Sequence, residues 1–113
     1  MIVAIKSFND KNTEALWEGR KTKKSWPINQ IGERALRKLN VLDAATKLND
    51  LRLTPGNRFE SLEGTDEYSI RINQRWRICF AWEPADQAAI FSGSIDLAEA
   101  PGSAVNVYID DYH

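Results

Sequence analysis

The chain has 113 residues, of which 42% are apolar and 27% charged, and its formal net charge is −1. This balance predicts one globular domain over residues 1–113, and the single cysteine, Cys79, excludes an internal disulfide. No apolar run approaches the ~18 residues that a membrane span needs, the start lacks the pattern of a signal peptide, and no motif implies a cofactor or metal, so we expect a cytoplasmic protein without a cofactor.

The near-neutral total conceals two oppositely charged halves. Residues 1–58 hold 12 Lys/Arg against 6 Asp/Glu, net +6, whereas residues 59–113 hold 3 against 10, net −7. Such a split indicates either a nucleic-acid face or charged partner, or two halves that neutralise each other in the fold.

The chain begins with a predicted strand and a predicted helix. Residues 2–6 are apolar and mostly β-branched, which is typical of a short strand. Asp10 or Asn12 can cap a helix over roughly residues 11–18, and Gly19 fits its end. The basic run at residues 20–24 is a turn that is either solvated surface or a contact for nucleic acid or an acidic partner.

The strongest helix signal follows. Pro27 suits the first turn of a second helix. Apolar residues recur at three- and four-residue steps from Ile28 to Ala45, which predicts an amphipathic helix of about twenty residues. Its apolar stripe is core or a face for a partner. Residues 51–56 then break the helix, with Pro55-Gly56 as the turn signal.

The second half predicts a series of strands. Residues 57–64 form a short strand and a turn, Ala88 to Phe91 can form a further strand, and Val105 to Ile109 closes the sheet. Residues 92–104 form an irregular insertion. The order of elements predicts an α+β fold with two N-terminal helices packed on one face of a mainly antiparallel β-sheet.

A hairpin from Tyr68 to Trp82 carries the clearest strand pattern. Its apolar face holds Tyr68, Ile70, Ile72, Trp76, Ile78, Phe80 and Trp82. Because apolar faces must meet across the strands, we predict a three-residue loop at 73–75, which places Arg71 opposite Arg77 on a free face. Two opposed arginines indicate an anion over that face, or else arginines on a solvated sheet or paired with nearby carboxylates.

Motifs in this order run through nearly the whole chain. They are Leu42-Asp43-Ala44-Ala45-Thr46, Leu51-Arg52, Pro55-Gly56-Asn57-Arg58, Leu62 with Gly64, Ser69-Ile70-Arg71-Ile72-Asn73, Trp76-Arg77-Ile78-Cys79-Phe80 with Trp82, and Asp111-Tyr112-His113. With them the chain resembles the HigB branch of the RelE/ParE superfamily of type II toxins. The resemblance implies a compact RelE-like fold and a ribosome-dependent, metal-independent endoribonuclease that cleaves mRNA and inhibits translation. It also implies a helix-turn-helix, HigA-like antitoxin, with DNA contacted only through the toxin–antitoxin complex.

The resemblance places the chemistry at the terminal triplet and on Arg77. RNA is cut without a metal when its 2′-OH attacks the neighbouring phosphate, which needs a proton acceptor, a proton donor and cations. His113, the only histidine, is a ready acid or base near neutrality. Asp111 acts as base or orients His113, Tyr112 stacks on a splayed base, and Arg77 grips phosphate oxygens.

Further candidates lie around the hairpin. Arg71, Arg58 and Arg75 are candidates for binding RNA or phosphate. Glu60 and Glu63 stand where relatives often carry polar or basic residues, so they mark possible altered positions of the site, where a carboxylate repels phosphate unless it acts as base. Two alternatives follow: a weakened or inactive toxin fold that binds only the antitoxin, and a non-enzymatic, ParE-like gyrase inhibitor, against which the terminal triplet argues.

Overall fold

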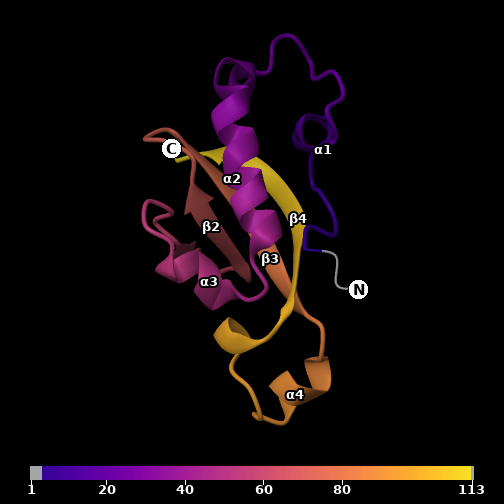
Figure 1. The fold of residues 1–113 in the computed structure, drawn as a ribbon, viewed down its shortest axis with the longest axis vertical. Coiled ribbons are helices and arrows are strands. Elements are labelled where there is room, and N and C mark those ends of the chain that lie inside the picture. The colour runs from indigo at the N-terminus through magenta and orange to yellow at the C-terminus, as the bar shows by residue number, and fades with distance from the viewer. Residues whose placement is uncertain (1–3, 113) are drawn as a thin grey trace.

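One antiparallel sheet organises the protein in a computed structural model that describes residues 4–112 (Figure 1). Its strands are β1 (Glu60–Ser61), β2 (Glu67–Arg71), β3 (Trp76–Pro84) and β4 (Gly102–Asp111). The sheet order is β1-β2-β3-β4, and each strand pairs antiparallel with the next along the chain. The sheet is therefore a meander, and with its helices the fold is α+β, as predicted.

Short helices accompany the sheet. They are α1 (Lys11–Glu18), α2 (Gly32–Ala44), α3 (Leu48–Leu53) and α4 (Gln87–Phe91), with 3-10 turns η1 (Pro27–Ile31) and η2 (Leu97–Glu99). None of the helices in the described part of the chain is long and apolar enough to cross a membrane.

The first helix is the one that the sequence predicts. The side chain of Asp10 accepts a hydrogen bond from the Asn12 N–H at 2.8 Å, and Gly19 ends α1 with a left-handed φ of 73°. The strand expected at residues 2–6 lies partly outside the described residues. Ile5 and Phe8 form isolated parallel bridges to β4 instead of a described strand.

The expected twenty-residue helix is wrong, because this stretch forms η1, α2 and α3. Pro27 begins η1, and Ala45 adopts an extended conformation that ends α2. A new helix then starts because the Asp50 side chain accepts hydrogen bonds from the N–H groups of Thr46 at 3.0 Å and Lys47 at 3.2 Å. The break expected at residues 51–56 therefore falls too early, since α3 continues to Leu53.

The strand expected at Ala88 to Phe91 is also wrong. These residues lie in α4, where the Asp86 side chain caps the helix by accepting from the Ala89 N–H at 3.1 Å. The irregular insertion expected at residues 92–104 ends earlier, because β4 begins at Gly102. A side chain at Gly102 would collide with the backbone of β3, so glycine permits this pairing.

The hairpin has the predicted register. Ile70 lies opposite Ile78 and Arg71 lies opposite Arg77. The Ile72 N–H donates to the Trp76 carbonyl at 2.9 Å and closes the three-residue loop.

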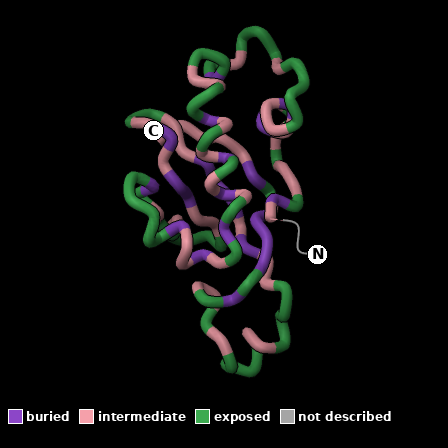
Figure 2. Tube along the Cα trace, viewed as in Figure 1, coloured by how far each residue is buried: buried purple, intermediate pink, exposed green. Residues whose placement is uncertain are grey.

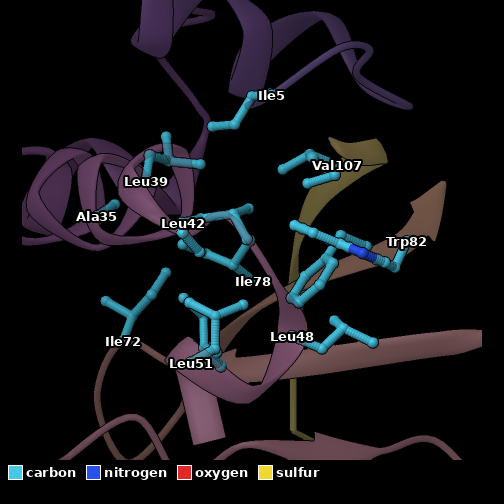
Figure 3. Close-up of a cluster of buried hydrophobic side chains, with 14 of the residues drawn as sticks. Ile5, Ala35, Leu39, Leu42, Leu48, Leu51, Ile72, Ile78, Trp82 and Val107 are labelled. Atoms are coloured by element: carbon cyan, nitrogen blue, oxygen red, sulfur yellow. The ribbon is translucent and has the colours of Figure 1, made fainter. Parts of the chain in front are cut away.

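The core lies between one face of this sheet and the helices. Figure 3 shows Leu39 and Leu42 of α2 and Leu51 of α3 near Ile72 and Ile78 of the hairpin. The buried helical residues of the core cluster come from η1, α2 and α3. Thr13 and Ala15 of α1 are also buried, but outside this cluster, against which α1 packs half-buried side chains. The core cluster unites both halves of the chain.

The opposite face of the sheet is not free along its whole length. Ser69 and Cys79 are fully buried there, and burial raises the pKa of the Cys79 thiol to about 11. Beside them the Tyr108 hydroxyl donates to Glu67 Oε1 at 2.8 Å. The centre of this face is therefore covered.

We predict that Leu42→Ala lowers the free energy of unfolding by about 2–5 kcal/mol, because Leu42 is completely buried in the core cluster. Urea denaturation measures the change. Leu53→Ala is the matched control, since Leu53 is 72% exposed and its truncation should cost less than about 0.5 kcal/mol. Equal losses in both variants would contradict the placement of the core.

Candidate active site

A surface hollow beside the hairpin loop gathers arginines from four segments of the chain. Its volume is about 620 Å³, and Arg34 of α2, Arg58, Arg71 of β2 and Arg75 line it. No carboxylate is among its lining residues. Such a concentration of guanidinium groups is suited to an anion, because guanidinium binds phosphate or carboxylate oxygens in pairs.

A second, smaller hollow adjoins the first. Its volume is about 170 Å³; it shares Arg58, Arg71 and Gln74 with the larger hollow and adds Glu60 and Tyr112. We call the two hollows together the arginine cleft. The cleft therefore holds cations, a carboxylate and a phenol within one surface depression.

Backbone hydrogen bonds fix Arg71 at the edge of the sheet. Its N–H donates to the Asn57 carbonyl at 2.6 Å, and its Nε donates to the Asn73 carbonyl at 3.0 Å. The second bond turns the guanidinium towards the hairpin loop. Arg71 therefore reaches the cleft from a position that strand pairing sets.

Asn57 holds the segment that carries Arg58. It is fully buried; its side-chain amide donates to the Leu51 carbonyl at 3.1 Å and its side-chain oxygen accepts from Lys38 Nζ at 2.8 Å. Arg58 follows with a left-handed φ of 44°, which is strained for a residue other than glycine. The hydrogen bonds of Asn57 thus stabilise the unfavourable backbone conformation of Arg58, which an unconstrained loop would not keep.

Arg77 lies directly opposite Arg71, and a carboxylate of the next strand compensates its charge. It forms an ion pair with Asp110 of β4, with 3.2 Å between Nη2 and Oδ2, and its side chain is only 20% exposed. Its guanidinium lies 5.2 Å from the centre of the Tyr112 ring. One of the two opposed arginines is therefore neutralised by a neighbouring strand, while the other lines the cleft.

The Tyr112 hydroxyl is a buried polar group that lines the cleft. Its oxygen is buried and has no hydrogen-bond partner within residues 4–112. Burial, and then the negative charge of Glu60, raise the pKa of Tyr112 against the opposing charges of Arg71, Arg77 and Arg58. The hydroxyl therefore stays protonated at neutral pH and is available to donate a hydrogen bond to a bound anion.

Asp111 and Tyr112, the two described residues of the terminal triplet, contact different arginines. Asp111 accepts a hydrogen bond from Arg75 Nε at 3.1 Å, and the Arg75 guanidinium lies 4.5 Å from the centre of the Trp76 ring. Alternation along the end of β4 turns Asp110 rather than Asp111 towards Arg77. His113 lies outside the described residues.

The two glutamates of interest are separated. Glu60 lines the smaller hollow, whereas Glu63 is exposed in the turn before Gly64 and lines neither hollow. Of these two glutamates, Glu60 is thus the one that lines the cleft.

Sequence reasoning missed three contributors to the cleft: Arg34, Asn57 in its positioning role, and Asp110. The face alternation of β4 against β3 was a signal that could have identified Asp110. No local pattern distinguishes Arg34 from the other charged residues on the polar side of α2.

Comparison with known proteins identifies relatives of the chain. Residues 6–96 match the family described as RelE-like toxin of type II toxin-antitoxin system HigB. The chain is 36% identical over 107 residues to Toxin HigB-1 of Vibrio cholerae serotype O1, an alignment that covers 93% of this chain and 94% of that protein. A protein of Haemophilus influenzae described as uncharacterized is 41% identical over 49 residues, 42% of this chain and 48% of its own length.

The family match spans most of the chain, and the Vibrio cholerae relative matches it almost end to end. The chain belongs to the HigB-like family of RelE-like toxins of type II toxin–antitoxin systems.

We predict that Glu60→Gln lowers the pKa of Tyr112, because removing a negative charge beside the phenol makes the tyrosinate less unfavourable. The chemical shift of the Tyr112 ring ζ carbon, followed against pH by NMR, measures the change, and Tyr112→Phe assigns the signal. Glu63→Gln is the matched control and should leave the titration unchanged. A shift of equal size in both variants would place Glu60 outside the site.

Proposed function

We propose that this member of the HigB-like toxin family is a ribosome-dependent endoribonuclease that cleaves mRNA without a metal ion, inhibits translation and is neutralised by a cognate antitoxin. The observation that supports it most is the arginine cleft with the unpartnered Tyr112 hydroxyl at one end. That combination suits a phosphodiester, whose two non-bridging oxygens can accept hydrogen bonds from guanidinium groups and from a phenol.

The two hollows of the cleft have different roles in this proposal: one binds the RNA backbone and the other holds the phosphate that reacts. In this proposal the larger hollow, lined by Arg34 and Arg75, holds the phosphate backbone beside the cleavage point. The smaller hollow, where Arg58 and Arg71 meet Tyr112, holds the phosphate that is cut. Arg77, whose charge is paired with Asp110, positions the Tyr112 ring in this proposal, since its guanidinium lies 5.2 Å from the ring centre.

The proposed reaction is an attack by the RNA on its own backbone. The 2′-oxygen forms a bond to the adjacent phosphorus as the bond from phosphorus to the 5′-oxygen breaks, which leaves a 2′,3′-cyclic phosphate and a free 5′-hydroxyl. Glu60 accepts the proton of the 2′-OH, and His113 gives a proton to the departing 5′-oxygen. Arg58 and Arg71 stabilise the charge that grows on the phosphate, and Tyr112 donates a hydrogen bond to it.

The charge distribution favours RNA that is presented by a ribosome. The chain is net −1, and its second half is net −7 with 3 Lys/Arg against 10 Asp/Glu. Attraction of free RNA grows with the number of phosphates that a protein neutralises, and among the described residues only four arginines line the cleft. The cleft therefore acts best on a strand that another particle holds in position.

We expect Arg71→Ala and Arg58→Ala each to reduce mRNA cleavage by about 10²–10³-fold, because each removes a cation from the reacting phosphate. Expression in a bacterial host, with growth followed and transcript ends mapped, measures the effect. Arg52→Ala is the matched control, since Arg52 is exposed on α3 and lines neither hollow. Full growth arrest by both cleft variants would remove the site assignment.

We expect Glu60→Gln and His113→Ala to slow cleavage on purified ribosomes while RNA binding is retained, because both groups move protons and neither supplies the main attraction for phosphate. A ribosome-bound mRNA with a 2′-deoxy nucleotide at the cleavage point should resist the wild-type protein completely.

Faster cleavage by Glu60→Gln would contradict the proposed base and show that this carboxylate only repels the phosphate. Loss of DNA supercoiling by gyrase, with mRNA left intact, would instead support the gyrase-inhibitor alternative.

A further inference from the structure

An apolar groove lies at the end of the sheet remote from the arginine cleft. Its volume is about 330 Å³. Its apolar lining comes from β3, α4, η2 and β4, and consists of Ala81, Trp82, Pro84, Ile90, Phe91, Leu97 and Val105. In Figure 1, α4 lies at the bottom of the molecule and the loop between β2 and β3, which the cleft adjoins, lies in the upper half; the longest extent of the protein is 47 Å. The groove is thus a separate surface from the cleft.

Phe91 makes this surface unusual. It is 89% exposed, and within residues 4–112 only Leu53 is another large hydrophobic residue with comparable exposure. Figure 2 shows that the chain around α4 is exposed or half-buried. Large aromatic side chains left in water beside an apolar depression are the usual anchors of protein interfaces.

The charge around the groove is negative. No lysine or arginine occurs in residues 78–113. Two carboxylates line the groove: Glu83, which pairs with Lys6, and Asp66. Asp86 and Asp96 lie exposed on the segments that flank α4. Asp66, Asp86 and Asp96 form no ion pair within the described part of the chain. The groove therefore combines an apolar floor with an acidic rim.

We propose that this groove is the docking site of the antitoxin, which places an amphipathic segment there with apolar side chains against Phe91 and lysine or arginine side chains against the acidic rim. The partner role rests on the proposed function of the chain as a toxin that an antitoxin neutralises. Complementary charge supports a cationic protein segment, since an acidic surface repels nucleic acid. The basic turn at residues 20–24 of a second copy offers charge without apolar side chains.

The position of the groove has a consequence for neutralisation. The antitoxin binds one end of the molecule while the arginine cleft at the other end stays uncovered. Neutralisation then works by keeping the bound toxin off the ribosome rather than by filling the cleft. Variants of the groove should therefore escape the antitoxin without losing toxicity.

The test uses the purified antitoxin that is encoded in the same operon as this chain, with binding measured by titration calorimetry. Phe91→Glu should weaken binding at least tenfold, because it removes the anchor and adds a negative charge to an acidic rim. Leu53→Glu is the matched control, since Leu53 is 72% exposed but lies outside the groove, and it should bind as the wild type does. Circular dichroism and thermal melting verify that both variants are folded.

A second experiment reverses the charge of carboxylates at the acidic rim of the groove. Asp66→Lys with Asp96→Lys should weaken binding at low salt and reduce its dependence on salt, because favourable long-range charge is lost. Glu33→Lys is the control for a reversed charge elsewhere, since Glu33 is exposed on α2. In cells, the Phe91→Glu toxin should arrest growth even when the antitoxin is expressed with it.

Wild-type affinity in Phe91→Glu, or equal weakening in Leu53→Glu, would overturn the docking site. Self-association of the toxin that depends on Phe91, with antitoxin binding unchanged, would overturn it as well. Failure of RNA cleavage by the wild-type protein would count against the proposed enzyme alone, because the binding titration does not depend on catalysis.

Discussion

The register between β2 and β3 is the constraint on which the rest of the structure depends. The pair Ile70 and Ile78 sends apolar side chains to the helices, and the same register sets Arg71 opposite Arg77 on the other face. A slip of one residue would exchange the two faces, bury the arginines and expose the core. The pairing of β2 with β3 thus determines both which side chains enter the core and where Arg71 lies. The three-residue loop at 73–75 connects the two strands in this register.

The arginine cleft and the apolar groove lie at different ends of the sheet and differ in charge. The hairpin end is cationic, and the end near α4 is acidic and apolar. Between them the hydrogen bond from Tyr108 to Glu67 covers the centre of the face, where Cys79 is buried. The opposite net charges of the two halves of the chain are consistent with this separation, since Arg34 and Arg58 of the first half meet the hairpin of the second.

The hairpin and α1 were predictable from sequence because their signals are local: alternation along a strand, a capping aspartate and a terminal glycine. The long helix was not, because Leu48 continues the apolar periodicity although the chain turns between α2 and α3. The strand expected at Ala88 to Phe91 failed because the Asp86 cap outweighs an apolar run without a neighbouring strand. Asp110 required the pairing of β4 with β3, which only the assembled sheet reveals.

The most direct test of the central claim is a cryo-electron microscopy structure of the wild-type protein on a ribosome whose mRNA carries a 2′-O-methyl group at the cleavage point, so that the strand stays intact. Our account predicts a backbone phosphate between Arg58 and Arg71, within hydrogen-bond distance of the Tyr112 hydroxyl, and α4 turned away from the mRNA. A protein bound with its arginine cleft empty, or with α4 against the mRNA, would contradict it.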